Sequence, residues 1–85
     1  MHRATTRFWR CYQSLPVNVR KRADDAFVLV QKNPRHPSLR LKKVGPYLSV
    51  RVDITHRALA VADEEDFVWV WIGSHDEYDR MIRTR

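Results

Sequence analysis

Apolar and polar residues alternate most clearly within the stretch from Leu39 to Ile72. From Tyr47 to Ile54 every second residue is aliphatic, and this period of two predicts a β-strand with one buried face. Short breaks separate four β-runs in this stretch, at Gly45-Pro46, Thr55-His56 and Asp63 to Asp66. Because parallel strands would need long crossovers, three tight turns in a row predict an antiparallel meander.

The lengths of these turns predict a register in which Val44 faces Tyr47, Ile54 faces Arg57 and Ala62 faces Phe67. One face of the sheet then collects an aliphatic set able to bury a helix: Leu41, Leu48, Val50, Val52, Ile54, Leu59, Val61, Val68, Val70 and Ile72. The other face collects small, aromatic and basic residues: Arg40, Lys42, Arg51, Ala58, Ala60, Ala62, Phe67, Trp69 and Trp71. A slip of one residue would exchange these faces.

The N-terminal third lacks this regular alternation. Thr5 to Tyr12 is rich in β-forming residues and predicts a short strand. Proline in a first helical turn and an apolar stripe spaced four, four and three residues apart predict a helix over 16–32, with Val19, Ala23, Phe27 and Val30 on the stripe. Asn33-Pro34 ends this helix, and a break near Asn18 that divides it in two remains an alternative.

The C-terminal segment predicts a short amphipathic helix from Ser74 to Arg83. Ser74 followed by Glu77 fits a capping box, and Tyr78, Met81 and Ile82 form one apolar stripe. A helix of about ten residues is marginal in water, so it requires packing against the sheet. Together these elements predict a single α+β domain over residues 1–85.

Composition narrows the class of partner. The 85 residues carry a formal net charge of +6, which favours an anionic partner, although a merely soluble basic surface is the alternative. The single cysteine, Cys11, cannot form an internal disulfide and fits a reducing cytosol. No apolar run approaches the roughly 20 residues that cross a bilayer, and no signal peptide is recognised. We therefore expect a cytoplasmic protein.

Candidate chemistry gathers at one predicted end of the sheet. The acidic turn Asp63 to Asp66, interpreted as a solvated hairpin tip, would repel phosphate, which leaves the opposite end for an anion. His75 and Tyr78 lie three residues apart at the start of the last helix, so they project from one face. Arg57 and Arg51 extend toward the same corner, and cations near a helix N-terminus form a plausible phosphate pocket. The alternatives are a solvent-facing His75, a core Tyr78 and an exposed strand cation at Arg51.

The chain resembles the RelE/ParE superfamily of toxins from bacterial toxin–antitoxin systems. The resemblance is carried by three stretches and spans nearly the whole chain: NPRHPSLRLKKV, YLSVRVDITHRALAV and WIGSHDEYDRMI. It implies a RelE-like α+β fold with a short N-terminal strand, a helical segment, an antiparallel meander and a short C-terminal helix. It also implies a toxin that a cognate antitoxin neutralises. RelE-like members cut mRNA on the ribosome, and ParE-like members inhibit DNA gyrase.

The RelE-like activity would need neither a metal ion nor a cofactor. The resemblance then implies that Arg51 and Arg57 hold the phosphate, that His75 or Tyr78 exchanges protons, and that the cations of one stretch bind RNA or the ribosome: Arg40, Lys42 and Lys43. Between Gly73 and Tyr78 this chain has Ser-His-Asp-Glu, where relatives often place several basic residues, and this departure weakens the local positive field. A gyrase inhibitor and a non-toxic module that binds an antitoxin are the alternatives. Scattered histidines make a metal site a weak candidate.

Overall fold

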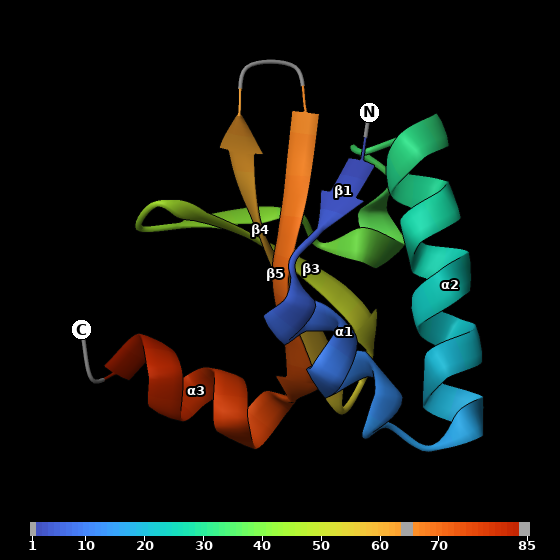
Figure 1. The fold of residues 1–85 in the computed structure, drawn as a ribbon. Coiled ribbons are helices and arrows are strands. Elements are labelled where there is room, and N and C mark those ends of the chain that lie inside the picture. Colours follow the sequence, from blue (N-terminus) through green and yellow to red (C-terminus); the bar gives the residue numbers. More distant parts are fainter. Residues whose placement is uncertain (1, 64–65, 84–85) are drawn as a thin grey trace.

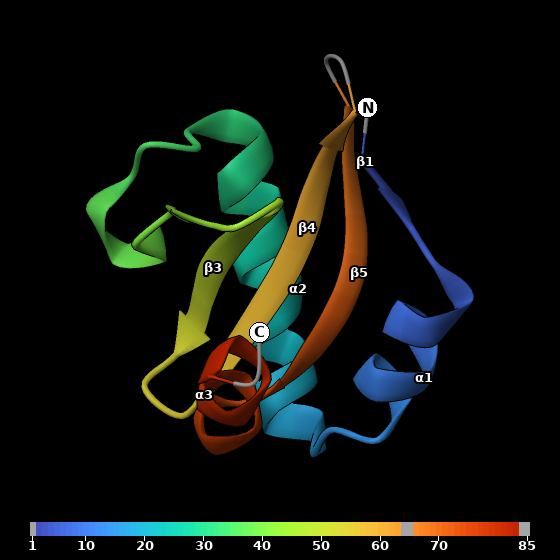
Figure 2. The same cartoon turned by 90° about the vertical axis from the view of Figure 1, so that its left-hand side faces the viewer.

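The computed structural model describes residues 2–63 and 66–83. The elements follow one another as β1 (His2–Ala4), α1 (Thr6–Gln13), α2 (Val17–Lys32), a 3-10 turn (Pro37–Leu39), β2 (Lys42–Val44), β3 (Tyr47–Asp53), β4 (His56–Asp63), β5 (Asp66–Ser74) and α3 (His75–Arg83). The strands form one sheet in the order β1-β5-β4-β3-β2. Helices α1 and α2 pack on one face of the sheet, whereas α3 lies across the other face at one end (Figures 1 and 2).

The predicted meander is confirmed, because β2, β3, β4 and β5 pair antiparallel in succession. The sheet also has a parallel fifth strand, since β1 pairs with β5. The predicted RelE-like α+β fold therefore holds, with a mixed rather than purely antiparallel sheet. None of the helices within the described ranges has the length and apolar character needed to span a membrane.

The prediction of a strand at Thr5 to Tyr12 is wrong, because this segment forms helix α1. The hydroxyl of Thr5 accepts a hydrogen bond from the Phe8 amide at 3.1 Å, which is the arrangement of an N-cap. Phe8 is buried, and Cys11 and Tyr12 are partly buried on the same side. Their spacing of three and four residues is helical, so packing of one helical face overrides the β propensity of the individual residues.

The helix predicted over 16–32 is confirmed as α2, and no break occurs at Asn18. Its buried residues are Val19, Ala23, Ala26 and Val30, which are the predicted stripe with Ala26 in place of the partly buried Phe27. The helix ends where Asn33 donates its amide to the Leu29 carbonyl at 2.7 Å. Small residues at Ala23 and Ala26 let the helix axis approach β3 closely.

The register is partly as predicted. Val44 faces Tyr47, and Ala62 faces Phe67. The predicted pairing of Ile54 with Arg57 is wrong, because an irregularity between Arg51 and Asp53 places Asp53 opposite His56 and Arg51 opposite Arg57. A second irregularity at Leu59 and Ala60 shifts the pairing with β5. Such bulges insert one residue into a strand and re-aim the side chains that follow.

These shifts redistribute the predicted faces. The core beneath α1 and α2 combines residues from both predicted sets, among them Val50, Ala58, Ala60, Trp69 and Ile72. Leu59 and Trp71 instead lie on the opposite face, where they pack with Tyr78 of α3. The predicted faces are thus wrong for β4 and for Trp69 of β5, whereas Ile72 and Trp71 lie on the predicted faces. The sheet buries side chains on both sides at the end that carries α3.

The predicted C-terminal helix is confirmed as α3. Ser74 Oγ accepts from the Glu77 amide at 3.2 Å, while the Ser74 amide donates to Glu77 Oε1 at 3.3 Å, which completes the capping box. Met81 and Ile82 add apolar contact to the cluster around Trp71. At the far end of the β4–β5 hairpin, Asp63 pairs with Asp66, and the predicted acidic tip at Glu64 and Glu65 lies outside the described residues.

Replacing Gly73 by alanine should weaken the docking of α3. A Cβ at this position would lie 2.5 Å from Cζ2 of Trp71, whose side chain is buried between β4 and α3. We expect a loss of about 1–3 kcal/mol in the free energy of unfolding, as for other overpacked sites, measured by urea denaturation. Because Trp71→Phe removes the clashing atoms, Gly73→Ala should cost less in that background. An equal cost in both backgrounds would contradict this packing.

Candidate functional site

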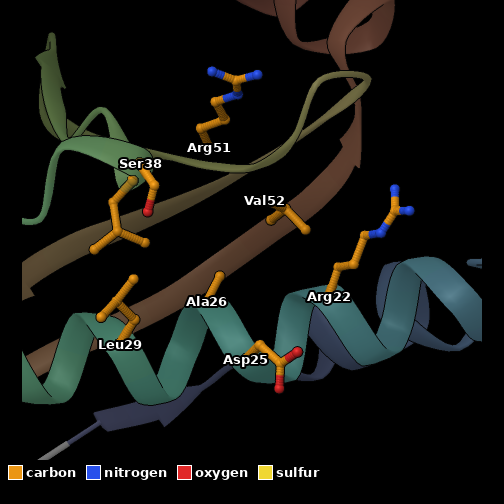
Figure 3. A pocket seen from close by; sticks show the side chains of 8 residues that line it. Arg22, Asp25, Ala26, Leu29, Ser38, Arg51 and Val52 are labelled. Carbon is orange, nitrogen blue, oxygen red and sulfur yellow. The ribbon is translucent and has the colours of Figure 1, made fainter.

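Two arginines from adjacent strands lie directly opposite each other at the end of the sheet that carries α3. Arg51 of β3 pairs with Arg57 of β4, and both residues are half-buried. Figure 3 shows that the Arg51 side chain points away from α2, whereas Val52 points toward it. Like charges directly across a sheet repel each other, so this pair is stabilised when an anion lies between the guanidinium groups.

The guanidinium of Arg57 is fixed by the backbone of the turn that precedes it. Its Nη1 donates to the carbonyl oxygen of Asp53 at 2.8 Å and to that of His56 at 3.0 Å. Burial lowers the pKa of Arg57 from its ordinary value, and the positive charges of Arg51 and Arg40 lower it further. Arginine nevertheless stays protonated in proteins. The site therefore concentrates positive charge in a partly desolvated position, where it attracts anions more strongly than in water.

Helix α3 brings the two remaining predicted site residues together. The rings of His75 and Tyr78 are stacked, with centroids 6.1 Å apart and an interplanar angle of 22°. Tyr78 is buried against Leu59 and Trp71, so it anchors the helix, and its hydroxyl interacts electrostatically with Arg57. His75 is partly exposed, and its Nδ1 lies 3.5 Å from a carboxylate oxygen of Asp79. The ring of Tyr78 therefore lies beside Arg57, and the ring of His75 is stacked on the ring of Tyr78.

The three cations predicted to bind RNA do not all lie on this face. Lys42 pairs with Ser49, which is two residues from Arg51 on β3, whereas Lys43 pairs with Leu48. Since paired residues share a face of the sheet and neighbours alternate, Lys42 projects to the arginine side and Lys43 to the α2 side. Arg40 has a left-handed backbone conformation, with φ of 45°, and its charge acts on Arg57. Arg40 and Lys42 thus extend the positive surface.

A separate cavity of about 230 Å³ opens between α2 and β3. Figure 3 shows Ala26 and Leu29 of α2 pointing toward Val52 and Ser38 across it, and Arg22 and Asp25 of α2 also line it. Its walls are mainly aliphatic, and Arg51 borders it while directing its guanidinium to the other side. The predicted site therefore lies on the α3 face of the sheet and not in this cavity.

Asp53, which was not among the predicted site residues, is the best-connected carboxylate of the site. Its oxygens accept hydrogen bonds from the Thr55 amide at 2.8 Å and the Thr55 hydroxyl at 3.0 Å, and one oxygen lies 3.2 Å from His56 Nδ1. Burial raises the pKa of Asp53, but the bonds from Thr55 and the contact with His56 outweigh it and hold the pKa below its usual value. An aspartate two residues before a threonine at a strand end is a recognisable turn signal.

The lowered pKa of Asp53 makes stability depend on acid pH. A carboxyl whose folded pKa is depressed stabilises the fold above its unfolded pKa, near 4, and this contribution is lost as pH falls through the folded pKa. We therefore expect Asp53→Asn to have a lower melting temperature than wild type at pH 6–7. The difference between the two melting temperatures should become smaller as the pH falls below about 4. Thermal melts followed by circular dichroism at both pH values test this. A constant gap at all pH values would contradict it.

Comparison with known proteins shows which family this chain is similar to. A family model described as ParE-like toxin domain matches residues 17–80, which is about three quarters of the chain. A search of curated protein sequences finds no significant match. Among solved structures, YafQ from Escherichia coli is similar with a TM-score of 0.72 and 8% identity, over 92% of this chain and 96% of that chain.

Two further structures show the same fold. A chain of the RelB–RelE antitoxin–toxin complex from Methanococcus jannaschii has a TM-score of 0.69 and 18% identity, over 92% of this chain and 96% of that chain. The YoeB/ParE toxin from Agrobacterium tumefaciens has a TM-score of 0.68 and 14% identity, over 87% of this chain and 96% of that chain. The family model and the shared fold agree with the resemblance carried by the sequence. This chain belongs to the ParE-like toxin domain family, and it shares the fold of these toxin structures.

Proposed function

We propose that this toxin is an endoribonuclease that cuts messenger RNA on the ribosome without a metal ion. The observation that carries the proposal is the direct pairing of Arg51 with Arg57 beside the phenol of Tyr78. Guanidinium groups bind phosphate oxygens in a fork geometry. Two of them on adjacent strands offer donors to both non-bridging oxygens of one phosphodiester.

The proposed reaction is a transesterification within the RNA. The ribose 2′-oxygen forms a bond to the adjacent phosphorus while the bond from phosphorus to the 5′-oxygen breaks, which leaves a 2′,3′-cyclic phosphate and a 5′-hydroxyl. A base accepts the proton of the 2′-hydroxyl, and an acid donates a proton to the departing 5′-oxygen. Arg51 and Arg57 stabilise the negative charge that develops on the pentacovalent phosphorus.

The proton transfers fall to His75 and Tyr78. The Asp79 carboxylate 3.5 Å from Nδ1 of His75 favours a proton on that nitrogen, which leaves Nε2 to accept one. Tyr78 places a phenolic O–H donor beside Arg57, and this donor can pass its proton to the departing 5′-oxygen. We therefore assign His75 the role of base and Tyr78 the role of acid.

Binding of the larger partners follows from charge. Arg40 and Lys42 extend the positive surface on the arginine side and are proposed to contact the phosphate backbone of the message or of ribosomal RNA. Lys43, on the opposite face, would contact a different segment of the ribosome. The net charge of +6 also suits an acidic cognate antitoxin. These partners place the proposed activity in the cytoplasm.

The test uses purified ribosomes that translate a defined message. Adding the toxin should produce new message ends only when ribosomes are present, and the fragments should carry a 5′-hydroxyl and a cyclic phosphate. A message with a 2′-deoxynucleotide at the mapped cleavage position should stay intact there, because the attacking hydroxyl is missing. Cleavage of the deoxy-substituted message, or no cleavage in either form, would overturn the proposal.

The match to a ParE-like family model favours inhibition of DNA gyrase as a second candidate function. In that case induced expression would cause DNA damage and filamentation with messages intact, and purified toxin would block supercoiling by gyrase. Normal growth upon expression, together with tight binding of an acidic protein encoded by the adjacent gene, would instead indicate a non-toxic module that binds an antitoxin.

A further inference from the structure

The short turn between β3 and β4 contacts the start of α3 and a side chain of α2. It begins at Asp53, the last residue of β3, and ends at His56, the first residue of β4. The carbonyl of Thr55 within the turn accepts the His75 amide at 2.7 Å, and this bond ties the start of α3 to the turn. Arg22 of α2 reaches the same turn from the other side of the sheet, with Nη1 3.4 Å from Asp53 Oδ2.

The Asp53 side chain stabilises the conformation of this turn. Only 10% of the side chain is exposed, and its Oδ1 accepts from both the amide and the hydroxyl of Thr55. The same oxygen lies 3.2 Å from Nδ1 of His56. An aspartate that bonds the backbone two residues ahead forms an Asx turn, and here two donors of Thr55 and one ring nitrogen of His56 converge on one oxygen. The carboxylate thereby fixes the backbone from residue 53 to residue 56.

The fixed backbone of this turn orients the side chain of Arg57. The carbonyl oxygens of Asp53 and His56, at the two ends of the turn, hold Nη1 of Arg57 at 2.8 and 3.0 Å. Among the residues that the structure describes, these two bonds engage Nη1 and leave the Nε and Nη2 donors for a ligand. Without them Arg57 would rotate away from Arg51, because the two like charges repel each other.

We infer that Asp53 is a positioning residue, which holds Arg57 beside Arg51 and keeps α3 docked by fixing the turn between β3 and β4. The inference rests on the proposed function in assigning Arg57 to the phosphate. Its structural core, the control of the Arg57 guanidinium by Asp53, is independent of which anion binds. Asp53 touches no reacting atom and acts only through the backbone carbonyls.

The effect on catalysis is a loss of turnover rather than of binding. Misplacement of a catalytic group by about 1 Å costs on the order of 100-fold in rate. We expect Asp53→Ala to lower kcat for message cleavage by roughly 10- to 100-fold, with KM changed by less than about twofold, because Arg40, Lys42 and Arg51 still bind the backbone. A substitution that merely lowered the amount of folded protein would reduce the concentration of active sites and leave the folded fraction with the wild-type kcat.

The orientation of Arg57 is measured directly by nuclear magnetic resonance of the uncomplexed toxin. In wild type the Arg57 Nη1–H signal, held by the two carbonyl oxygens, should be resolved and slow to exchange, and Arg57→Lys identifies it by its loss. Asp53→Ala should shift this signal by several line widths and speed its exchange. Asp53→Asn, which keeps an acceptor for Thr55 but loses the negative charge, should lie between the two. The matched control is Asp25→Ala, since Asp25 is an exposed carboxylate on α2, and it should leave the Arg57 signal unchanged.

The outcomes separate this inference from the proposed function. An Arg57 signal that is unchanged in Asp53→Ala and Asp53→Asn overturns the inference, whatever the toxin cleaves. If Asp53→Ala does not fold, the Asp53→Asn signal and kcat decide, and wild-type values for both overturn it. If the Arg57 signal shifts in the Asp53 variants but the wild-type toxin never cuts RNA, the positioning role is supported and the proposed nuclease activity is excluded.

Discussion

Replacing Arg57 by alanine is expected to abolish growth arrest and message cleavage while leaving the fold intact. Arg57 lies directly opposite Arg51 and is partly desolvated, so its charge acts strongly on a phosphate between the two strands. Loss of one such preorganised donor typically costs on the order of 100- to 1,000-fold in rate. We expect a decrease of at least about 100-fold in cleavage by ribosome-bound toxin, measured from the rate at which new message ends form.

The fold should tolerate this change because repulsion is removed together with the hydrogen bonds. Arg57→Ala loses the two bonds from Nη1 to the turn, and it also removes the unfavourable pairing of like charges with Arg51. The melting temperature should therefore stay within a few degrees of that of wild type. Arg10→Ala is the matched control, since Arg10 is an exposed cation on α1, and this variant should remain fully toxic. If Arg57→Ala remained fully toxic, the assignment of Arg57 to the active site would be wrong.

The elements that could be predicted are those in which side-chain period and local signals agree. The stripe from Val19 to Val30 and the stop at Asn33-Pro34 define α2, and Ser74 with Glu77 marks the start of α3. The segment around Phe8 was predicted incorrectly because its aromatic residues favour a strand by propensity. Its helical form depends on a surface made by α2 and β5, which lie far away in the sequence.

The register of the sheet could not be predicted from turn length. A turn of two residues after Ile54 would have placed Arg57 opposite Ile54, whereas the Asx turn at Asp53 begins the hairpin one residue earlier. That shift together with the irregularity between Arg51 and Asp53 brings Arg51 opposite Arg57. The choice between the two registers is made by tertiary packing, because Ala58 fits beneath α2 while Leu59 and Trp71 fill the space under α3. The residues of the candidate site were thus predictable by type, and their contacts were not.

The burial of Phe8 allows a second prediction with a large effect. Its side chain is 1% exposed, and its ring centroid lies 5.5 Å from that of Phe27 on α2 and 6.3 Å from that of Trp69 on β5. This single residue therefore attaches α1 to both the other helix and the sheet. Phe8→Ala leaves a cavity between three elements, which typically costs about 3–5 kcal/mol.

For a domain of this size such a loss is a large part of the total stability, which is on the order of 5–10 kcal/mol. We expect the melting temperature of Phe8→Ala to fall by about 15–30 °C, since 1 kcal/mol corresponds to about 4–8 °C in small domains. The matched control is Trp9→Ala, because Trp9 is the next residue on α1 but is 49% exposed, and its loss should cost less than about 1.5 kcal/mol. Equal destabilisation by the two substitutions would contradict the packing of Phe8 against α2 and β5, and with it the way α1 closes the core beneath the sheet.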